Sequence, residues 1–224
     1  MIGKFSRSSL KANQICARMK STITPSQLQE AFVWRRACKH FTAPKTPIDI
    51  KPVLESILAA PTCFGIQPFS VYVVSNPELQ AKLSPVSYNQ PQITEASYLL
   101  FFSASTDAKA MVERFLTANN IGDDAPLAGM LRGGIGSYDE ATMTSWARAQ
   151  SYIAMGFALS TLAQLRISSC PMEGFDSDGV AKLLEAGPNE KIFSVIAIGG
   201  PADPAVAFPR PRFRFPEDVM FKYL

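Results

Sequence analysis

One segment, residues 142–165, constrains the fold of this chain more than any other. Apolar residues recur along it at the three- and four-residue spacing of an α-helix, and they make it the longest helix that the sequence predicts. The apolar stripe is broad enough for a helix buried at the centre of a domain. Its members are Trp146, Ala149, Tyr152, Ile153, Gly156, Phe157, Leu159 and Leu162. We therefore expect the other elements to pack around this helix.

Short β-branched and aromatic runs predict strands at residues 69–74, 98–104 and 191–199, and residues 168–172 form a short strand or a loop. Further helices are predicted at residues 25–37, 49–60 and 107–119. Residues 84–92 read as a Pro-containing loop, and the Gly-rich residues 121–137 have no clear period. Helices flank at least three strands, so the fold class is α+β or α/β.

The charge of the chain is divided unevenly. The formal net charge is +3, but residues 1–23 hold five basic residues and no acidic residue, whereas residues 24–224 hold 17 basic and 19 acidic residues. The main domain, residues 24–224, is therefore almost neutral, which argues against binding to nucleic acid. No apolar run approaches the roughly 18 residues of a spanning helix, so we expect no integral membrane segment.

Residues 1–23 form a distinct N-terminal arm. On a helical wheel its cations lie on one side, and its apolar residues occupy the neighbouring and opposite arc. A basic, acid-free and Ser-rich amphipathic start is typical of a mitochondrial transit peptide. An ordinary surface helix or tail on a cytoplasmic protein is the alternative.

Several classes of catalytic site are excluded by the residues available. Cys16, Cys38, Cys63 and Cys170 are widely spaced, and His40 is the single histidine of the chain, so a zinc site is not predicted. The sequence also lacks the motifs of a serine triad, a Walker loop and a Gly-x-Gly-x-x-Gly fingerprint. Difficult chemistry would therefore depend on a bound cofactor.

Two basic clusters are candidates for binding a phosphate. Arg35, Arg36 and Lys39 follow the first predicted helix, and Arg210 and Arg212 lie near the C-terminus. Arginine binds phosphate with a forked pair of hydrogen bonds, and lysine adds a point charge. Each cluster taken alone is also explained as a solvated helix end or a solvated tail.

Three loops carry small polar groups suited to a planar heterocycle. Residues 61–69 and 88–92 are rich in hydroxyl, thiol and amide groups beside proline. Residues 170–176 include Gly174, where backbone N–H groups can face a ligand. Ordinary connecting loops are the alternative for the first two.

The order of these clusters resembles the FMN-dependent nitroreductase family. The motifs in chain order are Arg-Arg-x-x-Lys, Pro-Thr-x-x-x-x-Gln-Pro-Phe, Tyr-Asn-Gln-Pro-Gln-x-x-x-Ala-Ser, Trp-x-x-x-Gln-x-Tyr, Pro-Met-Glu-Gly-Phe-Asp and Pro-Arg-x-Arg. The resemblance covers about residues 25–215. It implies an α+β fold with a small central sheet, and an interlocked homodimer with two FMN sites at the subunit interface.

The resemblance also implies a role for each cation. Arg35 and Arg212 would hold the FMN phosphate, with Arg36 beside them and Arg210 as an additional cation. Lys39 would approach the N1/O2 edge of the flavin ring and stabilise the negative charge of the reduced ring.

The remaining site residues follow from the same resemblance. Asn89 would hydrogen bond to the pyrimidine edge, and the Glu173 and Gly174 amides would face flavin N5 and O4. Pro171 and Met172 would pack on the ring face. Four more residues would reach the site from the second subunit or from the long helix: Thr62, Cys63, Gly65 and Gln150.

Three positions depart from the family pattern. The family often has serine at Ala37, asparagine at Gly65 and a lysine at Gln92. Loss of that lysine is expected to lower the reduction potential of the flavin. Residues 105–140 do not match the family and should form a lid that sets substrate choice. Its candidate apolar contacts are Phe115, Met130 and Leu131.

The implied activity is hydride transfer from NADH or NADPH through FMN to nitroaromatic or quinone acceptors, by a ping-pong mechanism. The chemistry takes place at FMN N5, and we expect no essential side-chain acid or base. Two alternatives stay open. One is a flavin reductase or dehalogenase of the same fold acting on a specific metabolite, and the other is a non-enzymatic protein that binds flavin or a membrane surface.

Overall fold

The computed structural model describes residues 23–42, 45 and 47–224. Nearly all of the predicted targeting arm therefore lies outside the described residues. Within the described residues, no helix has the length and apolarity to cross a bilayer. The first described helix, α1 (Pro25–Trp34), begins as predicted, because Thr24 and Gln27 form a reciprocal capping box.

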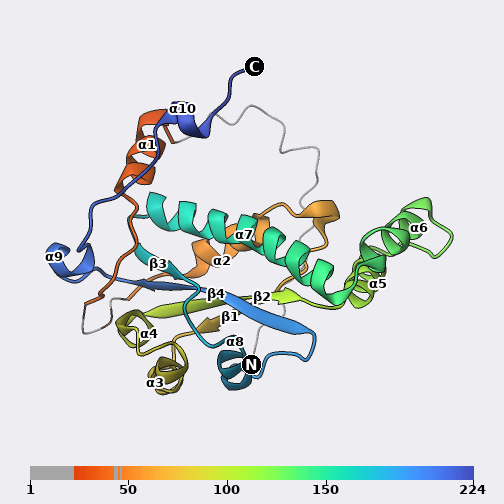
Figure 1. The fold of residues 1–224 in the computed structure, drawn as a ribbon, viewed down its shortest axis with the longest axis horizontal. Coiled ribbons are helices and arrows are strands. Elements are labelled where there is room, and N and C mark those ends of the chain that lie inside the picture. The colour runs from red at the N-terminus through yellow and green to blue at the C-terminus, as the bar shows by residue number, and fades with distance from the viewer. Residues whose placement is uncertain (1–22, 43–44, 46) are drawn as a thin grey trace.

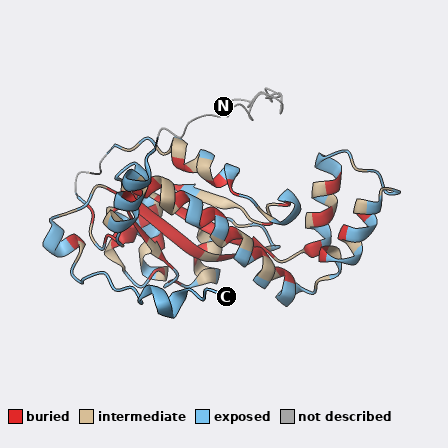
Figure 2. Cartoon of the chain, turned by 90° about the horizontal axis from the view of Figure 1, so that it is seen from above, coloured by how far each residue is buried: buried red, intermediate tan, exposed pale blue. Residues whose placement is uncertain are grey.

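The centre of the described chain is a four-stranded antiparallel sheet in the order β1-β2-β4-β3 (Figure 1). The strands are β1 (Val71–Val74), β2 (Tyr98–Ser105), β3 (Ser168–Met172) and β4 (Glu190–Gly199). The two middle strands, β2 and β4, are almost fully buried, as the red core of Figure 2 shows. Both of their faces are covered, which explains why they read as continuous apolar runs. The predicted strands are confirmed, and residues 168–172 are a strand.

Helix α7 (Glu140–Gln164) crosses one face of the sheet beside α2 (Lys51–Ala59) (Figure 1). Its small residues Ala154 and Ala158 are fully buried in a cluster with Val53 of α2 and Leu100 of β2. The predicted central helix is therefore confirmed. The apolar stripe is not buried throughout, because Ile153 and Phe157 are each 40% exposed.

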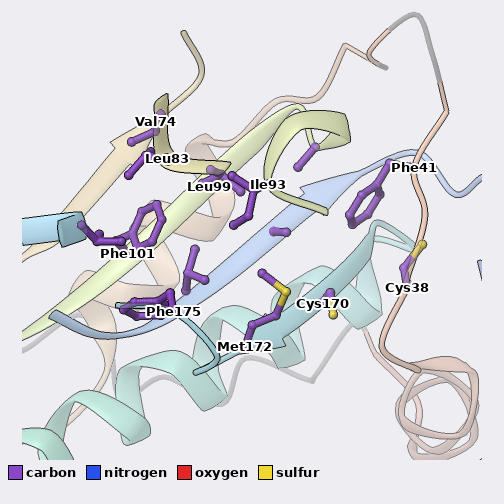
Figure 3. Close-up of a cluster of buried hydrophobic side chains, with 14 of the residues drawn as sticks. Cys38, Phe41, Val74, Leu83, Ile93, Leu99, Phe101, Cys170, Met172 and Phe175 are labelled. Atoms are coloured by element: carbon purple, nitrogen blue, oxygen red, sulfur yellow. The ribbon is translucent and has the colours of Figure 1, made fainter. Parts of the chain in front are cut away.

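Three shorter helices cover the other face: α3 (Pro77–Val86), α4 (Pro91–Glu95) and α8 (Ser177–Leu183). Figure 3 shows part of their cluster, in which the ring of Phe175 meets that of Phe101 edge-on with centroids 5.7 Å apart. The loop predicted at residues 84–92 is therefore only partly correct, because α3 continues through Pro85 and α4 begins at Pro91. Burial of Leu83 in this cluster outweighs the helix-breaking tendency of Pro85.

A helical hairpin extends from one end of the domain (Figures 1 and 2). It consists of α5 (Ala108–Ala118), α6 (Pro126–Gly133) and η3 (Ile135–Ser137). Arg132 closes it by binding Glu113 at 2.6 Å and Asp123 at 2.7 Å. Residues 121–137, which show no clear period in the sequence, thus contain a helix. They belong to the segment predicted to form a lid.

The end of α1 differs from the prediction. The helix ends at Trp34 rather than at Ala37, because Ala37 pairs with Ser169 of β3 in an isolated parallel bridge. The chain closes with α9 (Pro204–Ala207) and α10 (Glu217–Met220). The basic residues after α1 therefore lie in an extended segment at the edge of the sheet.

Candidate functional site

The two basic clusters predicted from the sequence meet in one pocket. The Cys38 N–H donates to Ser169 O at 2.9 Å, and the Lys39 N–H donates to Ala207 O at 2.8 Å, so the segment after α1 lies between β3 and α9. The resulting pocket has a volume of about 560 Å³. It is lined by Ala37 and by six cations, which are Arg35, Arg36, Lys39, Arg210, Arg212 and Arg214. Every cation predicted to bind phosphate is therefore at this site.

The electrostatics of this basic pocket are one-sided. No acidic side chain among the described residues lines it. Burial lowers the pKa of Arg35, and the charges of Arg214 and Arg212 lower it further. An anion in the pocket would relieve this repulsion, so the cations fit a phosphate group well.

Two of the cations are held firmly in place. The Arg212 guanidinium donates to Phe32 O at 2.7 Å and to Val33 O at 3.0 Å, at the C-terminal end of α1. Arg36 stacks over the ring of Phe208 at 4.8 Å. These contacts prearrange the pocket within a single chain.

Arg214 is a member of the pocket that sequence reasoning missed. The Arg-x-Arg-x-Arg spacing from Arg210 to Arg214 was the available signal, because alternate residues of an extended segment share one side. The Pro-Arg-x-Arg motif itself contains only Arg210 and Arg212.

Lys39 links the pocket to the middle of β3. Its Nζ donates to Cys170 Sγ at 3.6 Å. Cys170 is fully buried on β3 beside Met172, as Figure 3 shows. Burial raises the pKa of the Cys170 thiol, and the Lys39 charge partly offsets that rise. The thiol is therefore a neutral partner for the ammonium group.

Gln92 on α4 reaches the same thiol, since its side chain hydrogen bonds to Cys170. Gln92 is only 5% exposed, and its Oε1 has no hydrogen-bond partner among the described residues. A buried acceptor of this kind needs a donor from a ligand or from water. The imide N–H of a flavin pyrimidine ring is one donor of the right chemistry.

The predicted loops at the end of β3 also come together. The Gln90 Nε2 donates to Gly174 O, which joins residues 88–92 to residues 173–174. Asn89 has a left-handed backbone with φ of 52°, and its N–H donates to Ser84 O at 2.9 Å. Pro171 and Met172 are the final residues of β3. Lys39, the 88–92 loop and the end of β3 thus surround one region.

Glu173 has partners that the sequence did not predict. Its carboxylate accepts from the Arg148 guanidinium at 2.6 Å and from the Tyr152 hydroxyl. Arg148 and Tyr152 are one turn apart on α7, so a shared helix face was the available signal. Nothing in the sequence pairs that face with Glu173, which lies 25 residues from Arg148.

The remaining predicted site residues lie at a second place. The Cys63 N–H donates to Gln150 Oε1 at 2.8 Å, and the Gln67 N–H donates to Thr62 Oγ1 at 3.1 Å. Gly65 lines a mainly apolar pocket of about 740 Å³, together with Phe115. Within one chain, these contacts do not connect the loop that holds Thr62, Cys63 and Gly65 to the basic pocket. That this loop completes the flavin site of a second subunit stays a prediction.

The fold and the basic pocket together define an α+β protein suited to a ligand that bears phosphate. A family model described as the Nitroreductase family matches residues 32–200. The chain therefore belongs to the nitroreductase family and is an oxidoreductase, as the motif order predicted.

Comparisons with individual proteins agree. An NADH dehydrogenase of Thermus thermophilus is 28% identical over 189 residues, covering 83% of this chain and 92% of that protein. A provisionally named nitroreductase structure from Bacillus subtilis has a TM-score of 0.77 at 19% identity, covering 89% of this chain and 99% of that one. One from Exiguobacterium sibiricum, solved in complex with FMN, has a TM-score of 0.73 at 16% identity and covers 91% and 100%. The predicted fold class is confirmed.

Proposed function

We propose that the protein binds FMN and uses it to pass electrons from NADH or NADPH to nitroaromatic or quinone acceptors. The observation that carries this proposal is the basic pocket, where six cations gather without an acid among the described lining residues. Lys39 connects that pocket to Cys170 of β3. Family membership supports the class of reaction, and the Exiguobacterium sibiricum structure supports the choice of FMN.

In this proposal the cations of the basic pocket bind the FMN phosphate. Arg35 and Arg212 hold the phosphate, with Arg36, Arg210 and Arg214 adding positive charge. Such charge-assisted hydrogen bonds are about twice as strong as neutral ones.

The residues beyond the pocket bind the ring system. Asn89 and Gln92 offer amide groups to the pyrimidine edge, and the unpartnered Gln92 Oε1 supports this role. Pro171 and Met172 pack against the ring face, and the Glu173 and Gly174 amides point to its reactive edge.

When bound, FMN supplies the centre that accepts and donates hydride. The protein contributes position, charge and exclusion of water. Lys39 places a fixed positive charge where the reduced ring becomes negative, which favours reduction. No side-chain acid or base is required. Donor and acceptor would bind in turn over the same face of the flavin ring, which predicts ping-pong kinetics with parallel double-reciprocal plots.

The homodimer is part of the proposal. Large apolar side chains are exposed on α1, α2, α7 and the C-terminal segment, including Phe32, Leu58, Phe157, Phe215 and Tyr223. Exposed apolar residues gathered on neighbouring elements mark an interaction surface. A second copy would also bring Thr62, Cys63 and Gly65 to the other chain's site. Sedimentation velocity should show a dimer at micromolar concentration, and a monomer would contradict this part.

The acceptor and the N-terminal arm are each tested by an experiment of their own. A panel of nitroaromatics, quinones, enones and halogenated aromatics would separate the proposed activity from that of a specific flavin reductase or dehalogenase. For residues 1–23 we propose that they direct the protein to mitochondria, with cytoplasmic residence as the alternative. The relatives reported above are bacterial and lend the targeting no support. A reporter fused to residues 1–23 tests it, and diffuse signal would contradict it.

An anaerobic titration tests the proposed function as a whole. The FMN-loaded protein is titrated with NADH and with NADPH while the flavin absorbance is recorded. At least one donor should bleach the flavin stoichiometrically, and added quinone should restore the colour. A protein that binds FMN but is bleached by neither donor would leave only the non-enzymatic alternative.

A further inference from the structure

Glu173 accepts hydrogen bonds from two side chains of α7. Its carboxylate accepts from Arg148 at 2.6 Å and from the Tyr152 hydroxyl. Arg148 also donates to the Tyr152 oxygen at 3.1 Å, so the three groups form a closed triangle. Glu173 follows directly after the last residue of β3, so the triangle fixes the chain where the strand ends.

Aromatic rings hold the triangle in place. The Arg148 guanidinium lies 5.3 Å from the ring centroid of Phe193 and 5.6 Å from that of Tyr152. The rings of Tyr152 and Phe193 meet at an angle of 62° with centroids 5.2 Å apart. Cation–π contact and ring packing restrict the rotamers of both α7 side chains. Phe193 belongs to β4, so the triangle rests on the sheet.

Stability alone does not explain this arrangement. The side chains of Arg148 and Glu173 are 44% and 55% exposed, and ion pairs with that exposure contribute little to folding. The triangle has a larger effect on the position of the backbone that follows β3. The Gln90 side chain, from the 88–92 loop, donates a hydrogen bond to the carbonyl of Gly174, the next residue. Contacts from α7 and from the 88–92 loop thus both hold the Glu173–Gly174 segment.

We propose that Arg148 and Tyr152 are positioning residues that turn the Glu173 carboxylate toward α7 and neutralise it. The Glu173–Gly174 amides then stay available to the flavin, and the Glu173 charge does not oppose the negative charge of the reduced ring. Without Arg148, a free carboxylate would lie next to the redox centre. This inference rests on the proposed binding of FMN.

The protonation states suit this role. Burial raises the pKa of the Tyr152 hydroxyl, and the hydrogen bond to Glu173 raises it further. The hydrogen bond to Tyr152 raises the pKa of Arg148. Tyr152 therefore remains a donor, and Arg148 remains charged, at every pH at which the enzyme would be assayed.

The experiment measures the midpoint potential of bound FMN, which does not depend on turnover. The variants are Arg148→Gln, Tyr152→Phe and the double variant Arg148→Gln/Glu173→Gln. Lys191→Gln is the matched control, because it removes one exposed cation that binds Glu140 of α7 at 2.6 Å, away from Glu173. Thermal melts of each variant report folding, and Tyr152→Phe is the mildest change.

We expect Arg148→Gln to reduce the affinity for reduced FMN relative to oxidised FMN by about tenfold, which lowers a two-electron potential by about 30 mV. Tyr152→Phe should shift the potential in the same direction by less. The double variant should recover most of the loss, because the freed charge is removed, and Lys191→Gln should match the wild type.

Two results would overturn the inference while leaving the proposed function intact. One is an Arg148→Gln variant that binds FMN with an unchanged potential. The other is a double variant whose potential stays as low as that of Arg148→Gln, since the shift would then not come from the Glu173 charge. A wild-type protein that cannot bind FMN would instead overturn the proposed function and this inference with it.

Discussion

Lys39 Nζ donates to the buried Cys170 Sγ across 3.6 Å, and this contact joins the basic pocket to the middle of β3. The two residues are 131 positions apart in the chain. Because the Cys170 thiol is neutral, it orients the ammonium group without cancelling its charge. The Lys39 charge therefore remains available to a ligand that spans the pocket and the strand end.

The first prediction concerns that charge. Lys39→Met keeps the length of the side chain and removes its positive end. The midpoint potential of bound FMN should fall by about 30 mV or more, which corresponds to at least a tenfold loss of relative affinity for the reduced flavin. Spectroelectrochemical titration measures it, with Lys191→Met as a control of equal charge change. A potential that is unchanged or raised would contradict the placement of Lys39 beside the ring.

The second prediction concerns the phosphate. Arg35→Gln should weaken FMN binding by about 10- to 100-fold, since a hydrogen bond to a charged group contributes about 1.5–3 kcal/mol. Arg166→Gln is the control, because Arg166 faces Glu30 at 3.8 Å and does not line the basic pocket. Quenching of FMN fluorescence gives both dissociation constants. Equal losses in the two variants would point to a general effect of net charge instead.

The third prediction separates folding from binding at Gln92. Gln92→Leu removes a buried acceptor that lacks a partner among the described residues. The free energy of unfolding of the FMN-free protein should change by less than about 1 kcal/mol, because relief of the buried, unpartnered Oε1 offsets the loss of the hydrogen bond to Cys170. FMN affinity should nevertheless fall. Urea denaturation and FMN titration measure the two quantities, and a loss of stability with unchanged affinity would make Gln92 structural.

The fourth prediction is a dependence of stability on pH. Burial raises the pKa of Cys38 from 9.0 to about 11 in the folded protein. The folded state therefore favours the neutral thiol, so its contribution is complete below pH 9 and is lost as the pH rises toward 11. The free energy of unfolding should fall by up to about 1.4 kcal/mol per pH unit in this range.

Urea denaturation at pH 8, 9 and 10 checks this slope, with Cys38→Ala as the comparison. The variant should lose less stability between pH 9 and 10 than the wild type does. Part of the slope should remain, since the pKa of Tyr72 is raised to about 12 by burial and by its bond to Glu190. Identical slopes for the two proteins would contradict the role of Cys38.

The elements that the sequence predicted well are those with a strong local pattern. Strands β2 and β4 are buried on both faces, so their apolar runs were visible without tertiary information. The start of α1 was visible in the cap residue Thr24 and the proline after it. Its end was not, because the pairing of Ala37 with Ser169 links residues that are far apart in the sequence.

The candidate site was predictable where its residues lie in local motifs, but contacts between separate segments were not. The order of the motifs predicted correctly that Arg35, Lys39 and Arg212 belong to one site. It did not predict Arg214 or the hydrogen bond between Arg148 and Glu173. Each depends on how separate segments meet. Thr62, Cys63 and Gly65 remain apart from the basic pocket in the contacts of one chain, since their predicted role needs a second copy.

The central claim is that the basic pocket holds the phosphate of FMN. The most direct measurement compares the dissociation constants of the wild-type protein for FMN and for riboflavin, which carries the same ring without the phosphate. At about 1.5–3 kcal/mol for each hydrogen bond to a charged group, two such contacts predict that FMN binds at least about 100-fold more tightly. Equal affinities for FMN and riboflavin would contradict the account.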